Sequence, residues 1–300
     1  MATLPPLLLH AGAPLAPHDL WSAWSAEPLF ALPLAASAAL YARGVHALWA
    51  RAGRGRGVHG GAVMAFALGW LALALALLSP LHPLGGVLFS AHMAQHELLM
   101  VVAAPLLVAG RPLVPTLWAL PRRARTRLGA AARTPAVASA WRWLRTPLHA
   151  WWLHVGALVL WHLPVLYQAT LRHEGVHAAQ HVSFFGSALL FWWALLHGRA
   201  TRRGAAVTYL FAAMLATSVL GALLTVSTRL WYPAYAATTA PWGLMPLQDQ
   251  ELGGIIMWIP GGMSYLLAAL WLLARLLRDG AVRERSPRPP RAAAPLGRPA

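Results

Sequence analysis

The 300-residue chain contains no cysteine, and its 24 basic residues are all arginine, because lysine is absent as well. Without cysteine, the chain cannot form disulfides, thiolate metal sites, CxxC redox centres or covalent c-type haem attachments. Any metal site must therefore use histidine, methionine, carboxylate or backbone ligands. Acidic residues are also scarce, and the 8 that occur leave a formal net charge of +16.

Charged residues of either sign make up only 11% of the chain, whereas a soluble domain carries roughly 25%. Hydrophobic residues account for 58%, and the chain has 16 tryptophans. The motifs HExxH and GxSxG, a P-loop and a glycine-rich dinucleotide loop are all missing. The composition predicts an integral membrane protein rather than an enzyme, and we expect no soluble small-molecule substrate.

Seven apolar stretches are long enough to cross the hydrocarbon core of a bilayer, which takes about 20 residues. Backbone polar groups in lipid must be hydrogen-bonded within their own segment, so we expect each stretch to be a helix. The predicted spans are 28–49, 61–79, 91–109, 148–167, 178–197, 205–228 and 252–277. The sequence thus predicts an all-α integral membrane protein, with a bundle of seven transmembrane helices over residues 27–278.

The arginines are distributed very unevenly between the two sides of the predicted bundle. The connections after the first, third and fifth spans, together with the C-terminal end, carry 22 of them, and the other connections carry only Arg172 and Arg229. The positive-inside rule then places the N-terminus outside and the C-terminus in the cytoplasm. The same distribution accounts for the net charge, so we expect contact with anionic lipid headgroups and no nucleic-acid partner.

Three segments fall outside the predicted spans or connect them at length. Residues 1–26 have no basic residue before their first apolar run, so we expect an extracytoplasmic tail and no cleaved signal peptide. Residues 111–147 mix arginine with tryptophan and leucine, which indicates a cytoplasmic loop of amphipathic helices at the membrane surface. Residues 279–300 are rich in arginine and proline, and we expect a disordered cytoplasmic tail.

Two histidine pairs open long apolar runs. The sequence HMAQH covers residues 92–96, and HAAQH covers residues 177–181. Residues four apart share one face of a helix, so each motif presents two imidazoles side by side. Met100 lies one turn further along the face that carries His92 and His96. Both spans run from outside to inside in the predicted topology, so both pairs lie at the outer ends of their helices.

A fifth histidine, His162, lies near the outer end of the fourth span. At about 1.5 Å of rise per residue, His96 and His162 both lie about 7 Å below the membrane surface. Ionisable residues inside a membrane are expensive and usually face a functional site, although a lone interfacial histidine such as His82 more often meets lipid headgroups. We therefore predict a metal site formed by His92, His96, His162, His177 and His181.

Carboxylates lie at the same level of the predicted bundle. Asp249 and Glu251 lead into the last span, where we expect them to orient the ligating histidines as hydrogen-bond acceptors. The Pro260–Gly261–Gly262 sequence that follows predicts a kink or break and a close helix contact. Glu97 lies just inside the third span, where it either pairs with a histidine, takes part in proton movement or faces a wet cavity.

Imidazoles without thiolates suit copper, zinc and haem iron. A site that faces an oxidising exterior and has methionine nearby favours copper, because thioether sulfur suits Cu(I). Two histidines on facing helices would instead hold haem b as axial ligands. The residues thus leave three functions open, namely copper handling, a b-type haem electron carrier and a copper or proton transporter.

Several short motifs follow one another in order along the chain. They are HMAQH (92–96), PLLVAG (105–110), WHLP (161–164), HAAQHVSFF (177–185), DQ (249–250), GG (253–254) and WIPGG (258–262). This ordered set resembles the CtaG-type multi-helix assembly factors of cytochrome c oxidase, from about Leu20 to Leu277. The resemblance implies a plasma-membrane protein that matures a haem–copper oxidase at its copper centre, with oxidase subunits as partners.

The arginine distribution makes a prediction about topology. A reporter fused after Arg298 should lie in the cytoplasm. A tag at the N-terminus should be labelled from outside in intact cells. Labelling of the N-terminal tag only after lysis would contradict the predicted orientation.

Overall fold

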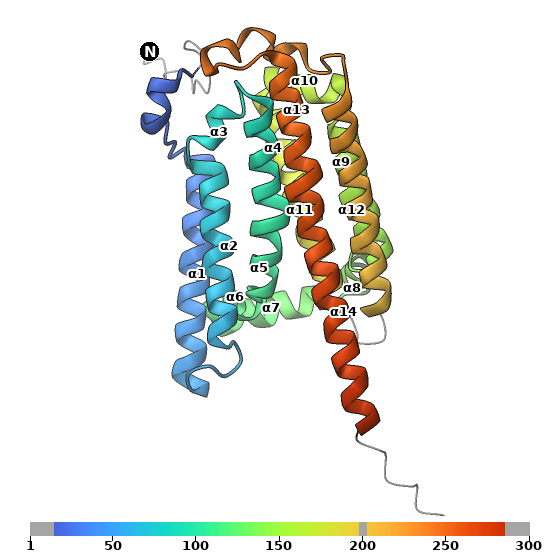
Figure 1. Cartoon of the computed structure of the whole chain (residues 1–300). Coiled ribbons are helices and arrows are strands. Elements are labelled where there is room, and N and C mark those ends of the chain that lie inside the picture. The colour runs from blue at the N-terminus through green and yellow to red at the C-terminus, as the bar shows by residue number, and fades with distance from the viewer. Residues whose placement is uncertain (1–14, 198–202, 286–300) are drawn as a thin grey trace, which may run out of the picture.

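A computed structural model describes residues 15–197 and 203–285, and this part of the chain is helical without any strand. The helices stand side by side in a bundle, and shorter elements cover its two ends (Figure 1). The long uninterrupted helices are α1 (Pro28–Ala52), α2 (Gly60–Leu78), α9 (Pro147–Trp161), α11 (Glu174–Leu196) and α12 (Arg203–Val226). Two more are composite, namely α4 (Phe89–Glu97), η2 (Leu98–Ala103) and α5 (Ala104–Ala109), and α13 (Pro246–Ile256), η6 (Met257–Gly261) and α14 (Gly262–Arg285).

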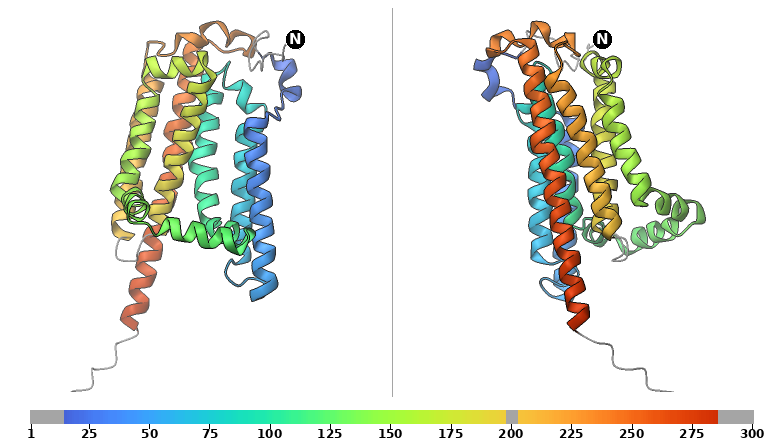
Figure 2. Two further views of the ribbon diagram at one scale, coloured as in Figure 1. Left: turned by 180° about the vertical axis from the view of Figure 1, so that it is seen from behind. Right: turned by 45° about the vertical axis from the view of Figure 1, so that its right-hand side comes forward.

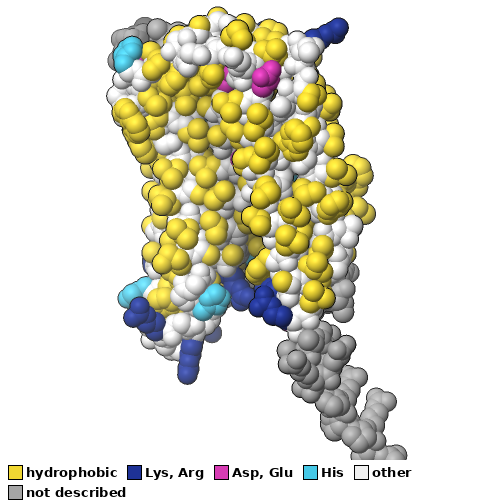
Figure 3. Space-filling model, viewed as in Figure 1, with side chains coloured by type: hydrophobic (Ala, Val, Ile, Leu, Met, Phe, Trp, Pro, Cys, Tyr) yellow, Lys and Arg dark blue, Asp and Glu magenta, His cyan; other side chains and the backbone are white. Residues whose placement is uncertain are grey.

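Short helices cover both ends of the bundle. One end carries η1 (Pro17–Ser22), α3 (Leu81–Leu84), α10 (Pro164–Arg172), η4 (Pro233–Ala237) and η5 (Ala240–Trp242); we call it the histidine end. The other carries α6 (Leu113–Ala119), α7 (Arg122–Ala132) and α8 (Pro135–Leu144), which run across the bundle (Figure 2); we call it the arginine-rich end. Figure 3 shows apolar side chains over the flank of the bundle and most of the visible arginine at the second end.

Six helices of the described chain are long and apolar enough to cross a membrane, or seven if a bent pair counts as one span. The bent pair is α9 and α10, which meet at 75°. The predicted fourth span ran straight to residue 167, whereas the straight helix ends at Trp161. The reason is Pro164, which has no N–H and disfavours helical geometry at Leu163 before it, where ψ is 128°.

The third span lies at the centre of the bundle. In its most apolar stretch 67% of the residues are buried, against 50% or less in the other five single-helix candidate spans. Its middle widens into the π-helical segment η2, where the N–H of Ala104 bonds to the carbonyl of Leu99, five residues back. The Met100 carbonyl in this segment accepts a hydrogen bond from the indole N–H of Trp192 at 2.9 Å. Such widened turns occur frequently at functional sites.

The last span is continuous through Pro260. The sequence predicted a kink or break there, and the helix does not break, because it continues from Pro246 to Asp279 and accommodates the proline within the π-helical segment η6. A close helix contact is present nearby, because a Cβ added to Gly221 of α12 would lie 2.7 Å from the carbonyl oxygen of Gly254. These glycines let two backbones touch, as small residues do in membrane helix pairs.

The predicted terminal segments fall partly outside the described residues. The helix α14 extends to Arg285, which is beyond the predicted boundary at residue 278, and residues 286–300 lie outside the described chain. Of the predicted N-terminal tail, residues 15–26 are described and contain the short helix η1. The predicted loop 111–147 consists of α6, α7, α8 and the turns between them.

Candidate metal centre

The central helix α4 begins at a buried carboxylate supplied from α13. Asp249 is fully buried and accepts hydrogen bonds from the backbone N–H groups of Phe89 (2.6 Å) and Ser90 (3.1 Å), and from the Ser90 hydroxyl. A carboxylate at this place satisfies N–H groups that have no partner within the helix, and it interacts favourably with the helix dipole. The contact fixes the start of α4 and therefore the position of His92, about one turn later.

This role of Asp249 differs from the one that the sequence suggested. We expected Asp249 and Glu251 to accept hydrogen bonds from ligating histidines, but Asp249 takes its donors from Phe89 and Ser90 because it faces the end of α4. Glu251 is partly exposed, and its backbone carbonyl lies 3.5 Å from the hydroxyl of Thr225. Asp249 thus acts on the histidines through the helix that carries them.

His92 is completely buried and is held through both ring nitrogens. Its Nδ1 lies 3.2 Å from the carbonyl oxygen of Gly85, which can only accept, so Nδ1 carries the proton in this contact. Its Nε2 lies 3.2 Å from the side-chain amide oxygen of Gln180, so His92 can serve as a metal ligand only when Nε2 leaves Gln180. The Tyr235 hydroxyl also donates to Gly85, at 2.8 Å. Burial raises the pKa of Tyr235, so this phenol keeps its proton and remains a donor.

His96 and His181 bring nitrogens without partners into the same space. Their side chains are 2% and 5% exposed, their ring centroids lie 5.3 Å apart, and all four ring nitrogens are buried without a hydrogen-bond partner. Buried polar atoms in proteins nearly always have a partner, so four such nitrogens at one place are suited to hold a ligand. Among the described residues, His92, His96 and His181 form a group whose ligand atoms all lie within 4.8 Å of one another.

The donor set of this three-histidine cluster fits a metal ion. A nitrogen ligand lies about 2 Å from a bound zinc ion, so three nitrogens on one ion of this size are roughly 3.5 Å apart. The present separations, which are within 4.8 Å, are of the same order, and the rings must turn toward one another to bind one ion. Imidazole nitrogens suit zinc, copper, iron and nickel, and the chain offers no thiolate that would narrow the choice.

His177 lies next to the three-histidine cluster, on the side that is less buried. Its ring centroid is 4.3 Å from that of His181 and 5.3 Å from that of His92, and it stacks on His82 of α3 at 5.4 Å with an interplanar angle of 1°. His82 is buried, with 6% of its surface exposed, and does not lie among headgroups as a lone interfacial histidine would. The two rings extend the imidazole group from the cluster toward the histidine end.

The structure does not bring His162 into the three-histidine cluster. His162 caps the end of α9, where its Nδ1 donates to the carbonyl of Leu158 at 2.7 Å and its Nε2 lies 3.4 Å from the sulfur of Met93. The two ring nitrogens are therefore already in contact with other groups. For His162 to serve as a ligand, its Nε2 must leave Met93.

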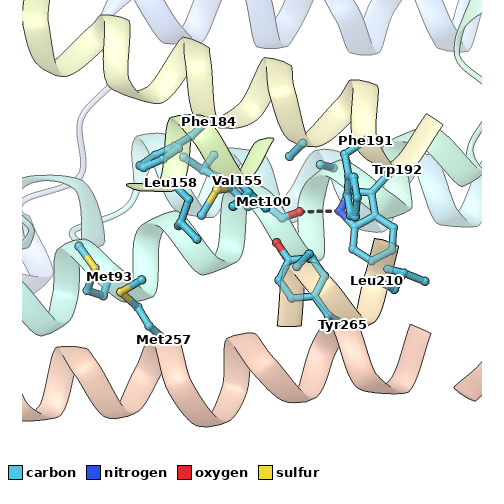
Figure 4. Packing of buried hydrophobic residues seen from close by; sticks show 14 of the residues in the cluster. Met93, Met100, Val155, Leu158, Phe184, Phe191, Trp192, Leu210, Met257 and Tyr265 are labelled. Atoms are coloured by element: carbon cyan, nitrogen blue, oxygen red, sulfur yellow. Dashed lines mark hydrogen bonds between the residues drawn. The ribbon is translucent and has the colours of Figure 1, made fainter. Parts of the chain in front are cut away.

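Met100 and Glu97 lie deeper than the cluster. Met100 packs in the apolar core with Val155 and Leu158 (Figure 4), so it does not extend the histidine stripe as a ligand. Glu97 is 7% exposed, and its Oε2 is buried without a hydrogen-bond partner. The carboxylate lies against η6, where a Cβ added to Gly261 would be 2.7 Å from its nearer oxygen.

Sequence reasoning missed the two glutamines within the histidine motifs. Gln180 faces His92, and Gln95 donates from Nε2 to the Ala76 carbonyl at 2.7 Å while contacting Nδ1 of His82 at 2.9 Å. A signal was present, because a glutamine directly precedes the second histidine in both motifs. It also missed Met93 as the neighbour of His162.

The fold and this site define a helical membrane protein with several spans and a buried imidazole cluster near one end. Comparison with protein families makes the class specific. The model of the cytochrome c oxidase caa3 assembly factor family (Caa3_CtaG) matches residues 39–279. The chain therefore belongs to that family.

Relatives among curated proteins come from mycobacteria. An uncharacterized protein of Mycobacterium leprae is 27% identical over 242 residues, which cover 75% of this chain and 36% of that protein. Uncharacterized proteins of Mycobacterium bovis and Mycobacterium tuberculosis are each 26% identical over 233 residues, or 73% of this chain and 34% of theirs. The chain thus spans about a third of the length of these relatives. No solved structure matches the chain.

The contact between Asp249 and α4 makes a prediction about stability. Asp249→Ala should lower the free energy of unfolding by about 1–3 kcal/mol, because it leaves buried backbone N–H groups of Phe89 and Ser90 without an acceptor. Thermal unfolding of the purified protein in detergent measures the change. Glu251→Ala is the matched control, since it removes a partly exposed carboxylate from the same helix. Equal unfolding temperatures for the two variants would show that the cap does not fix α4.

Proposed function

We propose that the chain assists assembly of a haem–copper oxidase by holding a copper ion at the three-histidine cluster before it enters the oxidase. Membership of the cytochrome c oxidase caa3 assembly factor family supports the choice of client. The single observation that carries the choice of site is the set of four buried, unpaired nitrogens of His96 and His181, with a nitrogen of His92 within 4.8 Å.

Copper is the ion we propose, because the three-histidine cluster offers imidazole nitrogens and the chain has no thiolate. The thioether sulfur of Met93, on the same helix as His92 and His96, contacts His162 outside the cluster. Imidazole accommodates either oxidation state of copper, and thioether favours Cu(I). An ion that must be passed on is better held by three neutral ligands than by thiolates, which bind copper more strongly.

The proposed orientation places the cluster at the outer face of the plasma membrane. The support is the arginine distribution in the sequence, since 22 of the 24 arginines fall after the first, third and fifth predicted spans or at the C-terminal end. Positively charged loops remain in the cytoplasm, which puts the three-histidine cluster on the other side. In this orientation, His177 and His82 lie between the three-histidine cluster and the outer face. Their imidazoles could bind a copper ion as it passes between the cluster and that face.

Two other functions have less support. Haem b would need two histidines on opposite faces of a flat macrocycle, but rings already lie close around the cluster, with His96 4.7 Å from Phe184 and His92 5.1 Å from Tyr167. A transporter would need a polar path toward the arginine-rich end. There His154 is buried and bonded to Tyr265 at 2.7 Å, with Ser187 at 3.4 Å on its other nitrogen.

Copper titration of the purified protein tests the proposal. His96→Ala and His181→Ala should each weaken binding by more than about 100-fold, because even the loss of a residue that only supports a ligand costs about 10- to 100-fold. The double variant should lose much less binding free energy than the sum of the losses in the two single variants, since ligands of one ion are coupled. His162→Ala should weaken binding by about tenfold or less, because His162 lies outside the three-histidine cluster.

The control is His46→Ala, which removes an exposed histidine of α1 near the arginine-rich end. An absorption spectrum of the same preparation distinguishes bound haem from bound copper, because only haem gives a Soret band. Wild-type copper affinity in the double variant would exclude the three-histidine cluster as the binding site.

A further inference from the structure

Two adjoining cavities lie at the arginine-rich end, far from the three-histidine cluster. The first, of about 610 Å³, is lined by four arginines; we call it the arginine cavity. The second, of about 940 Å³, is lined mainly by apolar side chains of α6, α7 and α8 and by Trp193 of α11; we call it the apolar cavity. Trp118 and Arg125 line both, so the two cavities adjoin at these residues.

The arginine cavity concentrates positive charge without any carboxylate from the helices that form it. Its four arginines are Arg43 and Arg51 of α1 and Arg122 and Arg125 of α7. No acidic residue occurs in residues 28–96 or 98–173, so α1, α6 and α7 contribute none. Like charges held close together repel, and the cavity therefore favours an anionic occupant.

Packing holds this charge in place. The guanidinium of Arg51 lies 5.5 Å and that of Arg125 4.5 Å from the ring centre of Trp118 on α6, so one indole positions two cations. Helix α6 is pressed against α1 at Gly44, where any side chain would overlap the backbone of Pro115. The arrangement thus depends on a backbone contact that only glycine permits.

The apolar cavity has the character of an acyl-chain site. Its lining includes Leu117, Leu128, Val137 and Trp141, which are between 37% and 50% exposed in the described chain. Arg145 lies on the same cavity and adds a cation to it. Large apolar surface beside clustered arginine, at the end of a membrane-spanning bundle, matches a ligand with a phosphate at one end and hydrocarbon at the other.

We propose that the two cavities form a binding site for an anionic phospholipid. Its phosphate lies in the arginine cavity between α1 and α7, and its acyl chains lie along Trp118 into the apolar cavity under α6–α8. Four arginines favour a headgroup with two phosphates over one with a single phosphate. The site is separate from the three-histidine cluster, and it would tie the helices α6–α8 to the membrane surface.

Lipid binding to the full-length protein in detergent tests this proposal by native mass spectrometry. The probes are a two-phosphate phospholipid (diphosphatidylglycerol), a one-phosphate anionic phospholipid (phosphatidylglycerol), zwitterionic phosphatidylcholine and inorganic pyrophosphate. The proposal predicts affinity in that order for the three lipids and weak binding of pyrophosphate, because pyrophosphate lacks acyl chains. Pyrophosphate binding as strong as that of the two-phosphate lipid would overturn the lipid assignment.

Arginine variants locate the site. Arg51→Gln with Arg125→Gln should weaken binding of the two-phosphate lipid by about 30-fold, since each arginine near a phosphate contributes roughly fivefold. Arg123→Gln with Arg127→Gln is the matched control, because both residues lie on α7, are exposed and line neither cavity. If the first pair fails to fold, Arg43→Gln with Arg122→Gln removes the other two cations. An equal loss of affinity for the two-phosphate lipid in the control pair would show that the effect comes from surface charge in general, and it would overturn the proposal.

Discussion

Unpaired imidazole nitrogens inside the bundle are the feature on which the rest of the structure depends. Leaving a buried polar group without a partner costs about 1–3 kcal/mol, and His96 and His181 bring four such nitrogens together. A fold retains such groups where the surrounding structure holds them in place and where function uses them. The helix that carries His92 and His96 is accordingly the most buried of the six single-helix candidate spans.

Contacts from separate parts of the chain hold that helix and its histidines. Asp249 fixes the start of α4, the Gly85 carbonyl sets the tautomer of His92, and Gln95 ties the same helix to the Ala76 carbonyl of α2. Each contact satisfies a buried polar group, so together they make the cluster rigid without using the nitrogens of His96 and His181. The backbone of such a site is in place before an ion binds, and the ion requires only side-chain movement.

Sequence periodicity predicted the helical bundle and the pairing of histidines on common faces, because both follow from local spacing. It did not predict the bend at His162, where Pro164 ends a straight helix and leaves the histidine beside Met93. It also misjudged Asp249 and His82, because their partners lie on other helices and long-range contacts leave no periodic signal. The depth estimate placed His96 and His162 at one level, but depth alone does not fix which way a ring points.

The most direct test of the account is the copper content of the oxidase in cells whose only copy of this protein carries His96→Ala and His181→Ala. The account predicts that oxidase subunits accumulate normally while copper per oxidase falls to the level of a deletion strain. Cells with His46→Ala, an exposed histidine on α1, should load the oxidase as wild type does. Full copper content in the oxidase of the double variant would contradict the account.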